Sequence, residues 1–331
     1  MAYSNFNQIF NAFEGLNVLI IGDVMIDAYI WGAVERISPE APVPIVRATK
    51  RDYRLGGAAN VALNVQALGA NPILCAVIGD DEGSIKFKER LTINGISNKG
   101  IVESKERPTT VKTRVLSGHH HMVRVDEETD RVLSKTEESQ LLKRIELLLS
   151  DCQVVIFEDY DKGVITRNVI KKTVEMAKAK NIPTVVDPKK RNFLAYKGTT
   201  LFKPNLKELK EGLKLDFEKD NQEEIEKAVE LLIEKLGADG SLITLSERGV
   251  FINFKNEKHQ IPAHLREIAD VSGAGDTVIS IAALCIALNL SPKIIAALSN
   301  LGGGLVCEHI GVVPIDKNDL LQEANKLNIP L

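Results

Sequence analysis

The residues best suited to chemistry lie in the run DVSGAGDTV, at positions 270–278. Small residues at 272–275 allow a tight turn that brings backbone amides close to a ligand. An apolar helical segment follows, and the free N–H groups and dipole at its N-terminus favour an anion. Asp276 falls in the first turn of that helix, where a carboxylate can accept the proton of an attacking hydroxyl. The run therefore predicts phosphoryl transfer, which needs preorganised donors around the moving phosphate.

A simpler interpretation of this run is an aspartate that caps a helix after a glycine turn, and an isolated G-x-G-D favours that alternative. The chain lacks the G-x-x-x-x-G-K-[ST] loop and also the H-R-D and D-F-G set of protein kinases. No G-x-G-x-x-G follows the first apolar run, which argues against a dinucleotide-dependent oxidoreductase. A kinase with this sequence belongs to neither of the two common classes.

The elements that must position this run alternate between apolar strands and amphipathic helices. Strands are expected at 17–23, 154–159, 183–188, 200–205 and 241–246, and helices at 56–69, 137–150, 167–180, 221–237 and from about 273. This alternation predicts an α/β fold with a mostly parallel central sheet and helices on both faces. We expect one domain spanning 1–331.

Two stretches interrupt the alternation, at about 28–55 and 100–128. Both are rich in Pro, Thr and Val, and both alternate polar and apolar residues without a helical period. We expect them to form extra strands of a small lid beside the main sheet. Strand edges exposed in such a lid often pair between subunits, which predicts a homodimer through the lid strands.

Polar residues follow several of the expected strands. Ligands of parallel α/β sheets bind beyond the carboxyl ends of the strands, so these residues are candidates for a site. The alternative is that Asp and Asn only cap turns and helices. The set comprises Asp23, Asp27, Asp159, Asp187, Asn205 and Ser246, of which Asp27, Asp159 and Asp187 are candidates for substrate binding.

Composition narrows the possible partners. A net charge of −3 gives no sign of a nucleic-acid partner held by bulk positive charge. The four cysteines are widely spaced, which favours reduced core thiols over disulfides or zinc. The N-terminus has no signal-peptide pattern and no run of 18 apolar residues occurs, so we expect a cytoplasmic protein with no membrane partner.

Three motifs together resemble the ribokinase-like (PfkB) carbohydrate kinase family over essentially the whole chain. GGAANVALNVQALGA (56–70) followed by IGDDEGS (78–84) is similar to the family's N-terminal signature, and DVSGAGDT (270–277) to its C-terminal signature. KPNLKE (203–208) contains the family's Asn-x-x-Glu pattern. The resemblance implies a ribokinase-like fold and a sugar kinase that uses ATP and Mg²⁺.

A narrower resemblance concerns the bacterial heptose enzymes. The segment 22–46, with the distinctive RISPEAPVP, is similar to the opening of their kinase domain, and 158–164 and 185–192 also match. This resemblance implies phosphorylation of D-glycero-D-manno-heptose 7-phosphate at its anomeric hydroxyl, on the route to ADP-heptose. Many relatives carry a second, nucleotidyltransferase domain, and we expect that activity on another chain. The rival expectations are a related kinase of another sugar, such as a ketohexose phosphate or ribose, and a non-catalytic binder of sugar or nucleotide.

The family resemblance also implies roles for individual residues. Asp276 would be the catalytic base, and the backbone of Gly273, Ala274 and Gly275 the anion hole. The remaining roles are sugar binding by Asp27, Gly56, Gly57 and Asn60, magnesium binding by Asn205 and Glu208, ATP contacts by Ser246 and Gly249, and an adenine contact by Asn300. The chain departs from the family after Asn300, where three glycines replace an alanine-rich helix and would weaken it by roughly 1 kcal/mol each.

A substrate that already carries a phosphate needs a second cationic pocket. Lys112 and Arg114 are two residues apart and would face one side of a strand, where Arg can bind phosphate through two hydrogen bonds. The other candidates are Arg124, Lys162, Lys189 and Lys190. The alternative is an edge strand protected by charge. The histidine run 119–121 is conceivable as a metal site, but a turn in the lid is the favoured interpretation.

Overall fold

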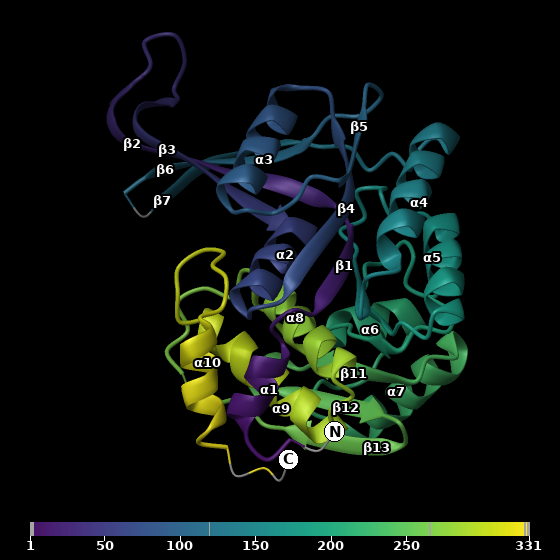
Figure 1. Ribbon diagram of the computed structural model, residues 1–331. Coiled ribbons are helices and arrows are strands. Elements are labelled where there is room, and N and C mark those ends of the chain that lie inside the picture. Colours follow the sequence, from purple (N-terminus) through teal and green to yellow (C-terminus); the bar gives the residue numbers. More distant parts are fainter. Residues whose placement is uncertain (1–2, 119, 265, 328, 330–331) are drawn as a thin grey trace.

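The structure is a computed structural model that describes residues 3–118, 120–264, 266–327 and 329. Its large sheet has the strand order β13-β12-β11-β10-β9-β8-β1-β4-β5 (Figure 1). These strands are β1 (Asn17–Gly22), β4 (Asn71–Gly79), β5 (Gly100–Ser104), β8 (Val154–Glu158), β9 (Thr184–Asp187), β10 (Leu201–Phe202), β11 (Gly240–Thr244), β12 (Val250–Phe254) and β13 (Glu257–Ile261). Only the β11–β12 and β12–β13 pairs are antiparallel, so the expected mostly parallel sheet is confirmed.

Helices cover both faces of this sheet, as expected. They are α1 (Phe6–Ala12), α2 (Ala58–Ala67), α3 (Glu82–Ile93), α4 (Lys135–Leu149), α5 (Arg167–Ala179), α6 (Leu206–Leu213), α7 (Gln222–Leu236), α8 (Ala274–Ala287), α9 (Pro292–Val306) and α10 (Lys317–Ala324). Alternate side chains of β1 enter different cores: Ile20 packs with α2 and α8, whereas Ile21 packs with α4 and α5. A strand buried on both faces has no polar side, which explains its continuous apolar sequence.

A four-stranded second sheet projects away from the large one (Figure 1). Its order is β3-β2-β6-β7, formed by β2 (Val24–Ile37), β3 (Pro44–Gly57), β6 (Thr110–Ser117) and β7 (His120–Glu127). The expected segment 100–128 is too long at its start, because 100–104 form β5 and pair with β4 in the large sheet. Ile101 and Val102 are buried in opposite cores, so their alternation reflects the large sheet. His119 lies outside the described residues, and His120 and His121 begin β7.

The three glycines after Asn300 do not end the helix, since α9 continues to Val306. A β-carbon at Gly302 would lie 2.1 Å from Ile281 Cδ1, and one at Gly303 would lie 2.7 Å from Val278 Cγ2. The glycines therefore let α9 approach α8 closely. Packing of a buried apolar face outweighs the poor helix propensity of glycine here.

The cysteines agree with the expected reduced thiols. Cys75, Cys152 and Cys285 are buried, Cys307 is half-buried, and all four are free. Across the part of the chain that the structure describes, no helix combines the length and the apolar character needed to span a membrane.

Candidate active site

Three neighbouring strands of the large sheet end in charged residues that lie side by side. Glu158 at the end of β8 is in register with Asp187 at the end of β9, and Lys203 directly follows β10. The Lys203 ammonium lies 2.8 Å from Asp187 Oδ2, and both side chains are almost fully buried. The strand register thus gathers these charges at the carboxyl edge, where α/β sheets bind ligands.

Helix α8 adds Asp276 to this edge. Carboxylate oxygens of Glu158, Asp187 and Asp276 lie within 4.8 Å of one another, and all three residues are buried. Glu158 Oε2 has no hydrogen-bond partner among the described residues. Such crowding of buried carboxylates is costly unless protons or cations neutralise it.

The crowding changes the protonation of these groups. Burial raises the pKa of Asp276 to about 6, and the negative charge of Asp187 acts in the same direction. Burial and the charges of Asp187 and Asp276 hold the pKa of Glu158 well above its usual range. A carboxylate with a pKa near 6 is ionised at neutral pH and is a stronger base than an ordinary aspartate.

Both oxygens of Asp276 accept hydrogen bonds. Asn60 on α2 donates through Nδ2 to Asp276 Oδ2 at 2.6 Å, and the hydroxyl of Tyr160 donates to Oδ1 at 3.0 Å. Asn60 Oδ1 is buried without a partner among the described residues. The structure therefore brings the predicted residues Asn60 and Asp276 into contact and leaves an unused acceptor beside them.

The predicted anion hole is the turn that begins α8. Gly273 adopts φ 84° as the N-cap, and the N–H of Ala274 donates to the carbonyl of Val271 at 3.3 Å. The amides of Gly273 and Gly275 have no such turn bond within the described ranges. A side chain at Gly275 would begin 3.7 Å from the Lys203 ammonium, so this amide borders the charged cluster.

The small sheet supplies Asp27, which is buried and forms an ion pair with Arg114 at 2.5 Å. Gly56 and Gly57 end β3 beside it: a β-carbon at Gly56 would lie 2.4 Å from Asp27 Oδ2, and Gly57 is the N-cap of α2. The candidate sugar-binding residues are thus connected through β3 to the helix that carries Asn60.

Five of the six candidate phosphate-binding cations are paired with carboxylates, and Lys190 has no such pair among the described residues. Lys112 and Lys162 approach the two oxygens of Glu128 at 2.9 Å and 2.6 Å. Arg124 pairs with Asp126 at 3.0 Å. Lys112 and Lys162 therefore converge, but on a carboxylate that a substrate phosphate would have to replace.

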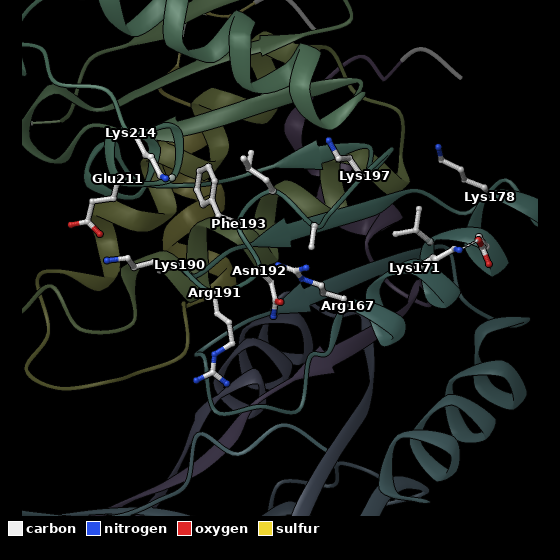
Figure 2. A pocket seen from close by; sticks show the side chains of 15 residues that line it. Arg167, Lys171, Lys178, Lys190, Arg191, Asn192, Phe193, Lys197, Glu211 and Lys214 are labelled. Atoms are coloured by element: carbon white, nitrogen blue, oxygen red, sulfur yellow. Dashed lines mark ion pairs between the residues drawn. The ribbon is translucent and has the colours of Figure 1, made fainter. Parts of the chain in front are cut away.

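Lys189 and Lys190 point to different places. The Lys189 ammonium lies 2.8 Å from Glu208 Oε1 and 5.4 Å from the centre of the Tyr160 ring. Although burial opposes its charge, the carboxylates of Asp187 and Glu208 raise the pKa of Lys189. Lys190 instead lines a groove on another part of the surface (Figure 2).

Asp159 organises a loop. Its Oδ2 accepts a hydrogen bond from the Tyr196 hydroxyl at 2.7 Å, and its Oδ1 accepts from the N–H of Asp161 at 2.9 Å. Asp23 accepts three backbone N–H bonds from the same loop, at 160, 162 and 164. These two aspartates hold Tyr160 in position, and the protein's own donors occupy their oxygens.

Asn205 and Glu208 form a capping box at the start of α6. Asn205 Oδ1 accepts from the Glu208 N–H at 2.8 Å, and Glu208 Oε2 accepts from the Asn205 N–H at 2.9 Å.

Asn205 and Ser246 line a cavity of about 760 Å³. Gly249 follows the 3₁₀ turn η1 (Ser246–Arg248) at φ 83°, and Asn300 donates to the Pro262 carbonyl at 2.9 Å.

Sequence reasoning missed Glu158, Tyr160 and Lys203. It selected Asp159 as the polar end of its strand, whereas β8 ends one residue earlier. Glu158 directly precedes Asp159 in the sequence, and adjacent strand residues face opposite sides, so Glu158 was an equally available choice. Lys203 lies in the KPNLKE motif, but nothing in the sequence pairs it with Asp187.

The chain is similar to known carbohydrate kinases. The model of the pfkB family carbohydrate kinases matches residues 16–318. The bifunctional protein HldE of Caulobacter vibrioides is 41% identical over 91% of this chain, and that of Desulfatibacillum aliphaticivorans is 37% identical over 93%. The chain spans only 62% and 63% of the length of these relatives.

Solved structures share the fold at low sequence identity. Escherichia coli phosphofructokinase-2 in complex with potassium superposes with a TM-score of 0.76 at 18% identity, covering 94% of this chain and 98% of that one. Arabidopsis thaliana ribokinase, complexed with ribose and ATP, gives a TM-score of 0.73 at 16% identity, covering 95% and 100%. The ribokinase-like fold expected from the sequence is confirmed.

Proposed function

Because the chain belongs to the pfkB family of carbohydrate kinases, we propose that it transfers the γ-phosphoryl group of ATP to the anomeric hydroxyl of D-glycero-D-manno-heptose 7-phosphate. The observation that carries the kinase proposal is the buried Asp276 carboxylate, which lies in the first turn of α8 next to free amides and contacts Asn60. The choice of heptose rests on the resemblance of residues 22–46 to the heptose kinases.

Asp276 acts as the base in this proposal. The anomeric hydroxyl donates to Asp276, its proton passes to the carboxylate, and its oxygen attacks the γ-phosphorus as the bond to ADP breaks. Asn60 Oδ1, which has no partner in the described structure, accepts a second sugar hydroxyl. The amides of Gly273 and Gly275 stabilise the charge on the transferred phosphoryl group.

The carboxylates beside Asp276 fit a divalent cation. Glu158 and Asp187 offer buried oxygens, one of them unpartnered in the described chain, and these are the ligands that Mg²⁺ prefers. We assign Mg²⁺ to these two residues, with Asn205 and Glu208 as further candidates that act through water. When bound with ATP, Mg²⁺ neutralises negative charge on the phosphates. Asp276 stays free for the proton because Asn60 and Tyr160 orient both of its oxygens.

The 7-phosphate is assigned to cations of the small sheet and to Lys162 in the loop after β8. Lys112 and Lys162 already converge on Glu128, and Arg114 lies beside Asp27. A phosphate that displaced Glu128 would keep both lysines paired. The small sheet would then act as a lid that excludes water.

We also propose a cytoplasmic homodimer in which lid strands pair, since Val123 and Val125 on the edge strand β7 are half exposed.

A panel of acceptors tests the substrate. We expect the heptose 7-phosphate to give a kcat/KM at least tenfold above that of fructose 6-phosphate or ribose, because only it fills both the sugar and phosphate sites. The measurement couples ADP release to a spectrophotometric assay, and phosphorus NMR identifies the product as a 1,7-bisphosphate. Equal or faster turnover of fructose 6-phosphate would assign the protein to another sugar within the same family.

Replacement of Tyr160 by phenylalanine should shift the pH profile. The Tyr160 hydroxyl donates to Asp276 and lowers its pKa, which opposes the effect of burial. Without this bond the pKa of Asp276 rises above about 6, so the acid limb of kcat/KM moves to higher pH. Activity at pH 6 should fall more than activity at pH 8. A uniform loss across the pH range would contradict this role for the hydroxyl.

A further inference from the structure

A groove of about 830 Å³ lies between α5, the segment 190–198 and the end of α6. Its volume is within the range of small-molecule sites. It does not include Asp276, Glu158 or Asp187, and it belongs to the face of the large sheet that packs α4, α5 and α7. The groove is therefore separate from the candidate active site at Asp276.

Cationic side chains surround this groove (Figure 2). The seven are Arg167, Lys171, Lys178, Lys190, Arg191, Lys197 and Lys214, against the two carboxylates of Glu175 and Glu211. The chain as a whole carries a net charge of −3, so the positive charge of the groove is opposite in sign to the net charge of the chain. Clefts lined by one sign of charge concentrate ligands of the opposite sign.

Most of the groove cations have no ion pair among the described residues, as is also true of some lysines elsewhere, such as Lys99 and Lys143. Elsewhere, Lys258 pairs with both Glu226 and Glu230, and Lys112 pairs with two carboxylates. In the groove, only Lys171 and Arg191 have an ion pair among the described residues, with Glu175 at 4.0 Å and with Asp130 at 2.8 Å. The other five form no ion pair among the described residues.

The lining between these charges is apolar. Val174, Phe193 and Ala195 lie in the groove, and Leu194 beside them is 38% exposed. The Phe193 ring packs edge-on against Phe202 at 5.1 Å. A β-carbon at residue 212 would lie 2.2 Å from that ring, so α6 borders the groove this closely only because Gly212 has no side chain.

We propose that this groove binds a phosphorylated small molecule with an apolar or aromatic body. The lysines supply flexible point charges for phosphate oxygens. Figure 2 shows them distributed along the groove, with Lys190 and Lys214 toward one end and Lys171 and Lys178 toward the other. That distribution favours an elongated anion over a single inorganic phosphate. The inference does not depend on the kinase assignment.

Calorimetric titration with inorganic tripolyphosphate tests the charge requirement, with wild-type protein and the variant K171Q/K178Q/K190Q. We expect the variant to lose at least tenfold in affinity. The matched control K99Q/K105Q/K143Q removes three exposed lysines outside the groove and should remain within twofold of wild type. Hydrogen exchange locates the probe, and protection is expected in peptides covering 190–198 and 167–178. Equal affinity in the groove variant, or protection only around 270–278, would overturn the proposal.

A second probe tests the apolar lining. We expect 1-naphthyl phosphate to bind more tightly than inorganic phosphate, and L194S to remove most of that advantage while leaving tripolyphosphate binding unchanged. Equal affinity for the two phosphates would show that the groove has no preference for an organic anion and would overturn that part of the proposal. Kinase turnover measured in parallel keeps this outcome separate from the proposed reaction.

Discussion

Replacement of Asp276 by asparagine is expected to lower kcat by about 10²- to 10⁴-fold, the range that a positioned general base contributes. The asparagine keeps the volume of the side chain but cannot take the proton. Binding of the sugar phosphate should remain close to that of wild type, as calorimetry can show. The control is D319N, which changes an exposed aspartate in the first turn of another helix, α10. Undiminished turnover by D276N would exclude Asp276 as the base.

The same variant should be more stable than wild type at neutral pH. Burial raises the pKa of Asp276 from 3.8 to about 6, so the ionised form opposes folding. This cost is absent below pH 4, grows between pH 4 and pH 6, and stays constant above, at roughly 2–3 kcal/mol. Asparagine has no charge to bury; its oxygen can still accept from Asn60, and its amide can donate to the oxygen of the Tyr160 hydroxyl. Unfolding by urea at pH 7.5 and pH 4 measures the difference in the free energy of unfolding between D276N and wild type. A difference of equal size at both pH values would show that the buried charge of Asp276 is not its cause.

The second large effect concerns stability and is expected for Lys203→Met. Lys203 is 3% exposed and pairs with Asp187, which is also buried. Removing one partner of a buried ion pair leaves an uncompensated charge and costs about 3–5 kcal/mol. The loss should be larger here than for a simple pair, because Glu158 and Asp276 also lie near Asp187. Urea unfolding should show a lower midpoint at an unchanged m-value.

Two further variants define the cause of that loss. Lys207 lies four residues away with a side chain that is 82% exposed, and K207M should change stability by less than about 0.5 kcal/mol. Adding D187N to K203M removes the unpaired charge and should restore part of the stability, which a double-mutant cycle quantifies. A K203M variant as stable as K207M would show that water or protons already neutralise Asp187.

The order of strands and helices along the chain follows from local sequence patterns. Apolar runs such as NVLIIG and VVIFE have no polar face, so they must be buried on both sides in a parallel sheet. The glycine turn before Asp276 and the apolar segment after it define an anion-binding helix N-terminus without tertiary information. These local rules also marked Asp276, whereas Asn60, which the structure brings into contact with it, was indicated only by the family resemblance.

The composition of the charged cluster depends on register and on contacts between distant segments. Glu158 rather than Asp159 faces Asp187, because β8 ends one residue earlier than the sequence suggested. Lys203 meets Asp187 only because β9 and β10 pair in parallel, and Tyr160 reaches Asp276 only because Asp23 holds its loop.

Local sequence patterns predicted most of the strands and helices and one candidate phosphate site at the start of α8, since both depend on neighbours along the chain. Tertiary structure alone decided which charges share a buried space and therefore how they titrate. The reason is physical: burial and through-space charge fix the pKa of Asp276, and both depend on residues that are distant along the chain, such as Asn60, Tyr160 and Asp187.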